Sequence, residues 1–521
     1  MFNINFSKED LEQIRSKGIS QEDVIQQIAN FKTGFPAIVL DSPATIDNGG
    51  IFHLSPEDED FYIRYFDEHS TDKKISKFVP ASGAATRMFK DLYAFTSVYD
   101  GTSRKNIDKD FPTVKEFLDN LPRFAFYDDL VETMKSMGMD LADYMERGDY
   151  TSIINCLLGK QMRYGSLAKG LIKFHKYSDG ARVAMSEHLT EAYRYAHNKD
   201  GWPAVHFTVS QEQRDAFGKE TFKLRKYFEE TIGVKFHIKF STQYSYTDII
   251  AVDEYNEPIR DDNGRLVFRP GGHGALLENL NYYHADMVFI KNIDNVIPDD
   301  PRVPDSKSTT ARYKKMLGGM LLYLQKEIFR MVELLQTRIP SNEELAYIED
   351  FMSNRLCIDI SRAKAAPQKE KLRILLSKLN RPLRVCGMVK NQGEPGGGPF
   401  WVVNGDGTKS LQIVETSQIN RKNSSQEAIL QQSTHFNPVD LACSYKAYNG
   451  RYFSLKNYVD TTTGIISKKS VGAKVVKSQE LPGLWNGSMA NWTTVFVEVP
   501  LETFNPVKTV NDLLRKEHFV K

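Results

Sequence analysis

Apolar residues recur at helical spacing in three long stretches of the chain. In residues 7–33 the apolar positions are Leu11, Ile14, Ile19, Val24 and Ile28. The same period returns in residues 111–163 and in residues 309–380, where Lys, Arg and Glu fill the positions between the apolar ones. This spacing predicts helices in all three stretches. We interpret the last as a helical insertion.

Short apolar runs bounded by turn residues predict strands in the rest of the chain. The first is Ile75–Val79, which ends in Pro-Ala-Ser-Gly. Further runs occupy residues 204–210, 236–240, 249–252, 266–268, 287–290, 383–389, 401–403, 411–414 and 495–499. Between residues 171 and 295 they alternate with helical stretches. Such alternation predicts an α/β fold with a mostly parallel central sheet covered by helices.

These predictions suggest a domain organisation. We expect an N-terminal helical region at residues 1–74 and a core at residues 75–510. Helical insertions interrupt the core at residues 91–165 and 305–380, and residues 511–521 form a C-terminal tail.

Composition narrows the class of protein. The 521 residues are 41% hydrophobic and 26% charged, values typical of a globular protein, and the net charge is only +1. A balanced charge argues against binding to nucleic acid or to an anionic membrane through the overall field. The four cysteines form neither a disulfide framework nor a zinc motif. Without an apolar span or a leader-like N-terminus, we expect a cytoplasmic protein.

A run of small residues follows the first predicted strand. Its sequence is Pro80-Ala81-Ser82-Gly83-Ala84-Ala85-Thr86-Arg87. Small side chains let a backbone approach a ligand closely, and N–H groups at a helix start can bind an anion. The run is equally typical of an ordinary strand-to-helix turn, and it does not match a P-loop.

Three further stretches carry residues suited to a phosphate or nucleotide site. Lys169 stands beside a glycine ahead of an apolar pair, three glycines surround His273, and Asp294 follows the apolar run 287–290. Ligands bind beyond the carboxyl ends of parallel strands, where an aspartate can hold Mg²⁺ on a phosphate. Taken singly, a solvated lysine, a surface loop and a turn aspartate explain these stretches as well.

In their order along the chain, these stretches resemble motifs of the uridylyltransferases of the UDP-N-acetylglucosamine and UDP-glucose pyrophosphorylase type. That family has a G-x-G-T-R loop, a P-K-G lysine, a strand with a glutamine, a P-D-G-N-G-G-like loop and a V-D-N strand end. The counterparts here are Ser82–Arg87, Ala168–Gly170, Gln243, Pro270–Ala275 and Ile293–Asn295.

The resemblance continues after the long helical stretch. Residues 412–419 are similar to V-V-E-Y-S-E-I, residues 436–441 to F-N-A-G-N-I, and residues 502–508 to E-x-F-x-P-x-K. The chain departs from the family in having alanines in the first loop and Gly271 and His273 in the later one. Its separation of Arg87 from Lys169 is also much longer.

The resemblance implies a nucleotide-diphospho-sugar transferase fold of the GT-A, Rossmann-like type. It further implies an Mg²⁺-dependent enzyme that makes an NDP-sugar and pyrophosphate from an NTP, with UTP the first choice, and a sugar 1-phosphate. It assigns the triphosphate to Ser82, Gly83, Ala84, Ala85 and Thr86, the pyrophosphate to Arg87 and the transition state to Lys169. It assigns the base to Gln243, Gly271, Gly272, His273 and Gly274, Mg²⁺ to Asp294 and Asp440, the sugar hydroxyls to Glu415 and Asn437, and the sugar phosphate to Lys508.

Two other functions are compatible with the sequence. A catalytically inactive nucleotide or nucleotide-sugar binding protein of the same fold would suit the altered loop, whereas Arg87 and Lys169 favour an enzyme. An RNA or protein interaction module would use the basic helical segment 355–390, although such segments are commonly solvated helix faces. We expect small-molecule substrates and neither nucleic acid nor membrane as partners.

Overall fold

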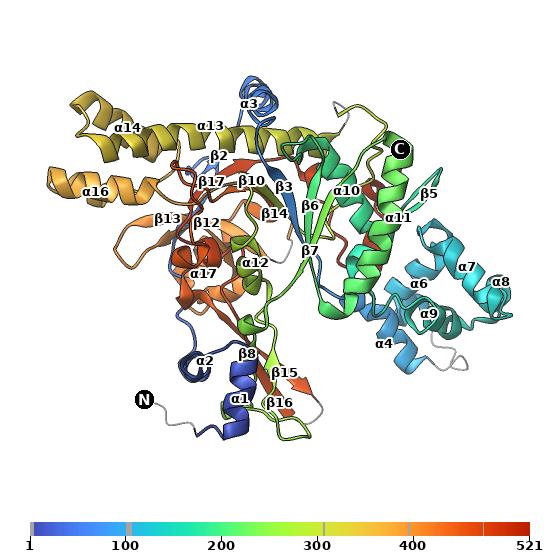
Figure 1. Ribbon diagram of the computed structural model, residues 1–521. Coiled ribbons are helices and arrows are strands. Elements are labelled where there is room, and N and C mark those ends of the chain that lie inside the picture. Colours follow the sequence, from blue (N-terminus) through green and yellow to red (C-terminus); the bar gives the residue numbers. More distant parts are fainter. Residues whose placement is uncertain (1–4, 100–106, 306–307, 394–395, 472–473, 521) are drawn as a thin grey trace. The chain divides into compact units, whose positions relative to one another are not determined.

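The computed structural model describes residues 5–99, 107–305, 308–393, 396–471 and 474–520 (Figure 1). The chain divides into two compact units. Unit 1 consists of residues 1–75, 241–290 and 313–501, and unit 2 of residues 76–240, 291–312 and 502–521. Each unit is therefore assembled from three separate stretches of the sequence.

The largest sheet of unit 1 has its strands in the order β2-β17-β11-β14-β10. Their bounds are β2 (Ile51–Phe52), β17 (Thr493–Glu498), β11 (Leu383–Lys390), β14 (His435–Ser444) and β10 (Met287–Lys291). The pairs β11–β17 and β17–β2 are parallel, whereas β14 is antiparallel to β11. Every residue of β14 is buried, so this strand runs through the core.

Three smaller sheets belong to unit 1. The antiparallel sheet β1-β12-β13 joins β1 (Leu40–Pro43), β12 (Gly397–Val403) and β13 (Lys409–Glu415). The hairpins β8-β9 and β15-β16 join β8 (Ile249–Ile250) to β9 (Phe268–Arg269) and β15 (Ile465–Val471) to β16 (Lys474–Glu480).

Unit 1 contains the helices of residues 7–33 and most of those of residues 309–380, two of the stretches for which the apolar spacing predicts helices. The bounds of the unit 1 helices are α1 (Lys8–Ser16), α2 (Gln21–Thr33), α3 (Pro56–His69), α12 (Leu277–Asn281), α13 (Thr309–Thr337), α14 (Asn342–Asn354), α15 (Ser361–Ala365), α16 (Gln368–Leu379) and α17 (Ser424–Gln431). The first four residues of α13 belong to unit 2. Ser7 and Ser20 form capping boxes at the starts of α1 and α2. The apolar side chains of these two helices pack on β8 and Leu266.

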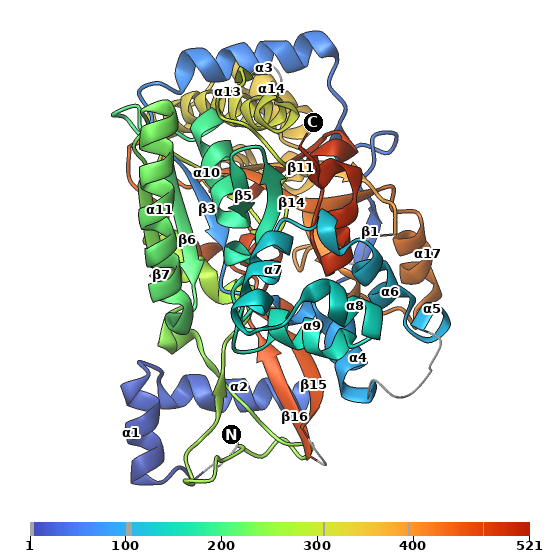
Figure 2. The ribbon, with the colours of Figure 1, turned by 90° about the vertical axis from the view of Figure 1, so that its right-hand side faces the viewer.

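Unit 2 contains the strands β3 (Ile75–Pro80), β6 (Ala204–Val209) and β7 (His237–Thr242), in that order, with β3 parallel to β6. The helices α10 (Ala184–Tyr195) and α11 (Arg214–Ile232) lie beside these strands (Figures 1 and 2). Phe217 of α11 packs its ring on Phe207 and Phe240. The hairpin β4 (Lys173–Tyr177) and β5 (Gly180–Val183) precedes α10.

A cluster of short helices forms the rest of unit 2. Its members are α4 (Lys90–Val98), α5 (Ile107–Asp110), α6 (Pro112–Asp119), α7 (Tyr127–Ser136), α8 (Leu141–Arg147) and α9 (Tyr150–Leu158). They share one apolar core, which Val507 and Val510 from the end of the chain also enter. Part of the insertion expected at residues 91–165, namely residues 100–106, lies outside the described residues.

The α/β fold class with a mostly parallel sheet is confirmed. Of the described helices, none combines the length and the apolar character that a membrane span requires.

Candidate functional site

In unit 2, β3 leads directly into the loop of small residues. Ser82, Gly83 and Ala84 are exposed, and no atom lies within 4 Å of the position that a Cβ on Gly83 would occupy. The backbone N–H groups of Ser82 and Gly83 donate to no other described residue. The loop then turns into a short 3₁₀ helix, Ala85–Arg87. It therefore presents open backbone donors to an approaching anion.

A second stretch of unit 2 holds this loop in place. The Lys169 N–H donates to the Gly83 carbonyl at 3.2 Å, and the Ala85 N–H donates to the Leu167 carbonyl at 2.9 Å. The Thr86 hydroxyl donates to the Gly165 carbonyl at 3.1 Å. Residues 165–169 thus lie against the loop although the sequence separates them from it by a whole helical cluster.

The Lys169 ammonium joins a third and a fourth stretch. It donates to Asp294 Oδ2 and to the Val507 carbonyl, both at 2.7 Å. The Lys169 and Asp294 side chains are 15% and 18% exposed, so both retain access to solvent. Asp294 follows β10, as expected for a residue at a strand end. The structure therefore brings the backbone of the small-residue loop, Lys169 and Asp294 together within one unit.

A fully buried group of charges lies under this site. The Glu191 carboxylate on α10 pairs with the Lys77 ammonium from β3 and, at 2.8 Å, with the Lys291 ammonium. His188 Nε2–H donates to the Ile293 carbonyl at 3.1 Å. Burial lowers the pKa of Lys77 to about 7. Burial alone would raise the pKa of Glu191, but the two ammonium groups hold it below its usual value. These contacts fix the segment that carries Asp294.

Two further cations of the sequence analysis lie in unit 2. Arg87 is exposed, and its guanidinium makes no hydrogen bond or ion pair with another residue that the structure describes. Lys508 follows Val507, whose carbonyl accepts from Lys169, and its own N–H donates to Asp512 Oδ2 at 2.8 Å. Its backbone is therefore fixed next to the Lys169 contact.

In unit 1, His273 and Glu415 lie close together. The Leu484 N–H donates to His273 Nδ1 at 3.0 Å, so Nε2 is the ring nitrogen that carries a proton. His273 Nε2 lies 3.8 Å from Glu415 Oε1, and the Asn486 amide donates to the same oxygen at 2.9 Å. His273 and then Asn486 lower the pKa of Glu415 against the effect of burial. A residue expected to face the base and one expected to bind the sugar thus share one hydrogen-bonding cluster.

The glycines beside His273 allow other segments of the same chain to pack closely against this loop. A Cβ on Gly271 would lie 2.6 Å from the Thr247 carbonyl oxygen, and one on Gly274 would overlap the Pro482 carbonyl. Gly272 has φ 73° and faces Glu480. Because the chain itself fills the space beside all three glycines, only His273 of this loop remains available to a flat ligand.

The other unit 1 candidates are held by neighbours. Gln243 is 3.5 Å from Asp248 Oδ1, to which its amide donates. The Asn437 side chain is buried and accepts the Val439 N–H at 3.0 Å. Asp440 is also buried, where it forms an ion pair with Lys314. That lysine compensates the charge of Asp440 inside the core of unit 1.

The described residues contain no group of three His, Cys, Asp or Glu side chains that could hold a metal ion. Mg²⁺ that arrives with a nucleotide needs less, since it takes one or two carboxylates together with phosphate oxygens and water. Asp294, partly exposed at a strand end, fits that requirement. Asp440, buried against Lys314, does not.

Several residues of these clusters have no counterpart in the motifs of the sequence. Trp485 stacks on the His273 ring with centroids 4.3 Å apart, and Asn486 holds Glu415. The turn signals Pro482-Gly483 and Asn486-Gly487, which flank Trp485, could have marked this loop. The Val507 carbonyl that binds Lys169 is a backbone group, which a residue pattern cannot reveal.

Residues 7–519 match the family described as a domain of unknown function, DUF4301, and the chain belongs to that family. No functionally curated protein matches it.

Among solved structures, the chain is similar to the uridine diphosphate N-acetylglucosamine pyrophosphorylase of Trypanosoma brucei, with 14% identity over 95% of this chain and 74% of that one and a TM-score of 0.45. It is also similar to a mutant UDP-glucose pyrophosphorylase of Leishmania major in complex with UDP-glucose, with 13% identity over 98% and 79% and a TM-score of 0.45.

Proposed function

We propose that the protein is a nucleotidyltransferase that makes an NDP-sugar and pyrophosphate from an NTP, UTP first, and a sugar 1-phosphate. The observation that carries the proposal is the contact of Lys169 with Asp294 beside the exposed loop 82–87. An oxygen of the sugar phosphate attacks the α-phosphorus of the NTP. The bond from that phosphorus to the bridging oxygen breaks, and pyrophosphate leaves with both electrons of the bond.

The residues of unit 2 would handle the phosphates. An ammonium has three donors, and Lys169 uses two of them on Asp294 and the Val507 carbonyl. The third remains for a phosphate oxygen between the two reacting groups. The N–H groups of Ser82 and Gly83 would bind the triphosphate, and the exposed Arg87 would stabilise the negative charge that develops on the leaving pyrophosphate.

Asp294 would also hold the Mg²⁺ that accompanies the nucleotide. Bound Mg²⁺ would neutralise part of the charge on the phosphates. In this arrangement the Asp294 carboxylate orients the Lys169 ammonium through one oxygen and leaves the other for the metal. Lys508, fixed next to Val507, would reach the phosphate of the sugar.

In unit 1, His273 and Glu415 would contact the remaining parts of the substrates. The His273 imidazole, stacked on Trp485, would offer a flat face for a base, and the Glu415 carboxylate is a good acceptor for sugar hydroxyls. Asn486 holds that carboxylate in position.

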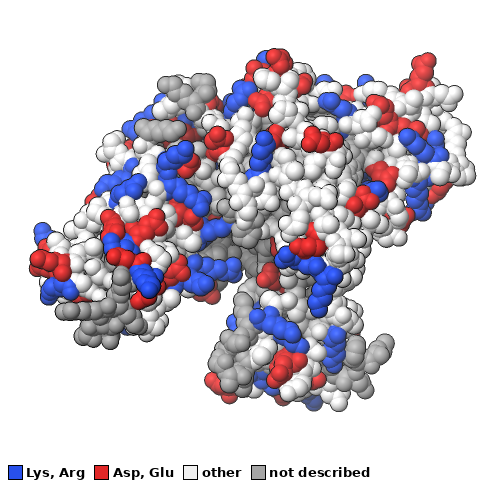
Figure 3. Space-filling model, turned by 180° about the vertical axis from the view of Figure 1, so that it is seen from behind, with Lys and Arg blue, Asp and Glu red and all other residues white. Residues whose placement is uncertain are grey.

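A second candidate is the inactive binding protein. It is suggested by Ala85, which stands where the motif has a glycine and packs into the apolar core of the helical cluster. Binding through Arg87 and Lys169 would then occur without transfer. An RNA or protein interaction module gains no support from the face shown in Figure 3, on which Lys, Arg, Asp and Glu are interspersed.

Pyrophosphate release from a panel of NTPs and sugar 1-phosphates with Mg²⁺ tests the proposal. We expect one pair to give turnover, and Lys169→Ala to reduce kcat by at least about 100-fold while nucleotide affinity changes less. Lys160→Ala, which removes an exposed lysine of the same unit, is the matched control and should behave as wild type. Nucleotide binding without pyrophosphate release for every pair would favour the binding protein instead.

A further inference from the structure

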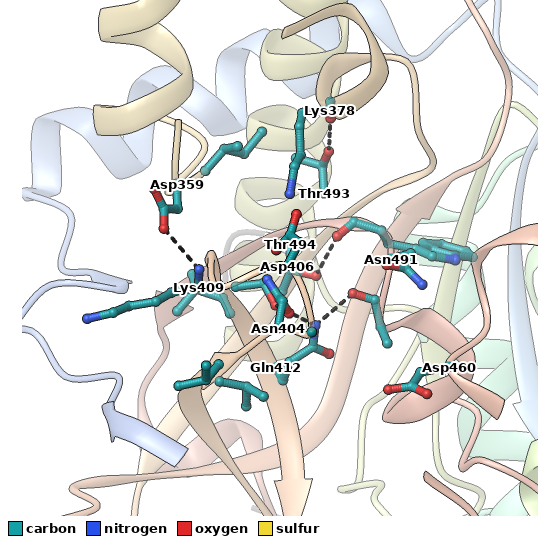
Figure 4. A pocket seen from close by; sticks show the side chains of 18 of the residues that line it. Asp359, Lys378, Asn404, Asp406, Lys409, Gln412, Asp460, Asn491, Thr493 and Thr494 are labelled. Carbon is teal, nitrogen blue, oxygen red and sulfur yellow. Dashed lines mark hydrogen bonds between the residues drawn. The ribbon is translucent and has the colours of Figure 1, made fainter. Parts of the chain in front are cut away.

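A cavity lies wholly within unit 1. It has a volume of about 750 Å³, in the range that small-molecule sites occupy. Helix α16, the loop at Asp406 and the segments around Asp460 and Asn491 line it (Figure 4). None of the residues that we assign to nucleotide, sugar or metal lines this cavity.

Two cations at the end of α16 face the cavity without a carboxylate partner. Lys378 lies in the last turn of α16, and Arg381 lies two residues after the helix ends at Leu379. Among the described residues, no carboxylate is within ion-pair distance of the Lys378 ammonium. Arg381 donates to the backbone carbonyls of Ser377 at 2.8 Å and Asn491 at 3.5 Å. Partial burial lowers the pKa of both side chains, against a smaller opposite effect of the Asp406 carboxylate.

The other cations that line the cavity are already paired. Arg362 is 3.4 Å from Asp406, and Arg373 is 2.7 Å from Glu370. Lys409 pairs with Asp41 at 2.8 Å. Among the described cations that line the cavity, Lys378 and Arg381 are therefore the ones without an ion pair. In Figure 4 the Lys378 side chain points from its helix into the space between α16 and the strand and loop residues opposite.

The remaining carboxylates at the cavity bind local donors. Asp359 accepts the N–H groups of Ser361 at 2.8 Å and Lys409 at 2.9 Å. Asp460 accepts the N–H of Thr462 at 2.9 Å and its hydroxyl at 2.6 Å. Neither carboxylate forms an ion pair with a described residue, so both can also accept hydrogen bonds from hydroxyl groups of a ligand.

Lys378 and Arg381 thus present an ammonium and a guanidinium that form no ion pair with a described carboxylate. Two such cations at one cavity favour a ligand that carries negatively charged oxygens.

We propose that this cavity is a binding site for a phosphate monoester of a small polyhydroxy compound, the class that includes sugar phosphates. Lys378 and Arg381 bind the phosphate by charge-assisted hydrogen bonds. Asp359, Asp460 and the amide of Asn491 bind the hydroxyl groups. The site is separate from the proposed transfer site, so it does not depend on the proposed function.

Calorimetric titration of the full chain, without nucleotide, tests this site. The probes are glucose 6-phosphate, fructose 6-phosphate and glycerol 3-phosphate, with glucose as the uncharged comparator. We expect at least one ester to bind saturably at millimolar concentration or below and glucose not to bind. Lys378→Met and, independently, Arg381→Gln should each weaken the binding of that ester by at least about tenfold.

Two controls locate the binding. Lys369→Met removes an exposed lysine of the same helix that does not line the cavity and should leave the affinity unchanged. Lys169→Ala should also leave it unchanged, because that lysine belongs to unit 2. The proposal fails if no ester binds, if glucose binds as well as its phosphate, or if the affinity is insensitive to both cavity variants. If only Lys169→Ala abolished binding, the ester would bind at the transfer site, and the proposal for this cavity would also fail.

Discussion

In the proposed mechanism, Asp294 would both orient the Lys169 ammonium, which donates to it, and offer an oxygen for Mg²⁺. Asp294→Asn keeps the shape and one acceptor but removes the charge. We expect kcat to fall by at least about 100-fold and the Mg²⁺ concentration for half-maximal rate to rise. Steady-state pyrophosphate release across an Mg²⁺ series measures both.

The matched control for that variant is Asp215→Asn, which changes an exposed carboxylate at the start of α11 in the same unit. It should retain the wild-type Mg²⁺ response. An Asp294→Asn protein with wild-type rate and wild-type Mg²⁺ dependence would contradict the proposed role.

For Arg87 we expect an effect on turnover without an effect on the fold, because its side chain does not position another residue. The guanidinium is exposed and makes no hydrogen bond or ion pair with another described residue, so its removal should leave the fold intact. We expect Arg87→Ala to lower turnover by at least about two orders of magnitude, as for loss of a charge that stabilises the transition state. Its thermal unfolding should superimpose on that of the wild type. Near-normal turnover would remove Arg87 from the mechanism.

The candidate site could be predicted only in part, because residue patterns mark some of its side chains but not its buried charge pairs. Lys169 and Asp294 stand out because glycine and apolar runs flank them, and the structure brings them into contact. Lys77, Glu191 and Lys314 gave no such signal, since a charged residue in a strand or helix looks solvated until its partner is known. The partners come from distant parts of the chain, and a sequence pattern does not pair them.

Among the elements, those with a clear period were predicted well. The apolar runs at residues 75–79, 204–210 and 383–389 correspond to β3, β6 and β11. The long strand β14 was not predicted, although all of it is buried. It contains Asn437, Pro438 and Asp440, residues that disfavour a strand. The Asp440–Lys314 pair and the Asx contact of Asn437 accommodate two of them.

Helix α13 depends on two glycines for its packing in unit 1. Gly318 lies against the Phe66 ring, and a Cβ on Gly319 would overlap the Tyr62 carbonyl, both on α3. Alanine favours a helix over glycine by about 0.8–1.0 kcal/mol, but overpacking costs about 1–3 kcal/mol or more. Because the overlap is with backbone, we expect Gly319→Ala to lower the free energy of unfolding by about 2 kcal/mol.

A helix glycine in open space supplies the control. Gly218 in α11 has no atom within 4 Å of its added Cβ. Gly218→Ala should therefore stabilise unit 2 by about 0.4–1 kcal/mol. Urea unfolding followed by circular dichroism compares the two variants. Stabilisation by Gly319→Ala would show that α3 and α13 pack less closely than described.

Across the whole molecule, the order of the chain does not follow the two units. Residues 502–521 return to unit 2 after the long unit 1 stretch 313–501. The expected tail at residues 511–521 includes His518, which is buried in unit 2. A sequence read from one end to the other shows helices and strands in order. Which stretches join in one unit depends on contacts between distant residues, which periodicity does not report.

The end of the chain gives unit 2 a dependence on pH. His518 Nδ1 and His175 Nε2 share a proton at 2.9 Å, and His175 Nδ1 lies 2.9 Å from Glu187 Oε1. Burial lowers the pKa of His175 to about 3, and burial together with His175 lowers that of His518 to about 3. Burial raises the pKa of Glu187 to about 8.

The two kinds of group act in opposite directions. Between pH 6.5 and 3 the unfolded chain binds protons at His175 and His518 that the folded chain excludes, so these residues lower the stability as the pH falls. Between pH 4.5 and 8 the folded chain keeps a proton on Glu187 that the unfolded chain loses, so Glu187 lowers the stability as the pH rises.

His518→Asn separates the histidine contribution from that of Glu187, because an amide can still hydrogen bond to His175 but does not titrate. Each histidine with a depressed pKa contributes a slope of up to about 1.4 kcal/mol per pH unit inside its window. We expect the variant to be less stable than the wild type at pH 7.5, where the native pair is neutral and well packed. As the pH falls from 6.5 toward 4.5, the difference in stability should shrink, because only the wild type loses the contribution of His518. Glu187 titrates alike in both proteins and does not affect the difference. Urea unfolding of unit 2 at a series of pH values measures it, and parallel curves would show that His518 is not held neutral by burial.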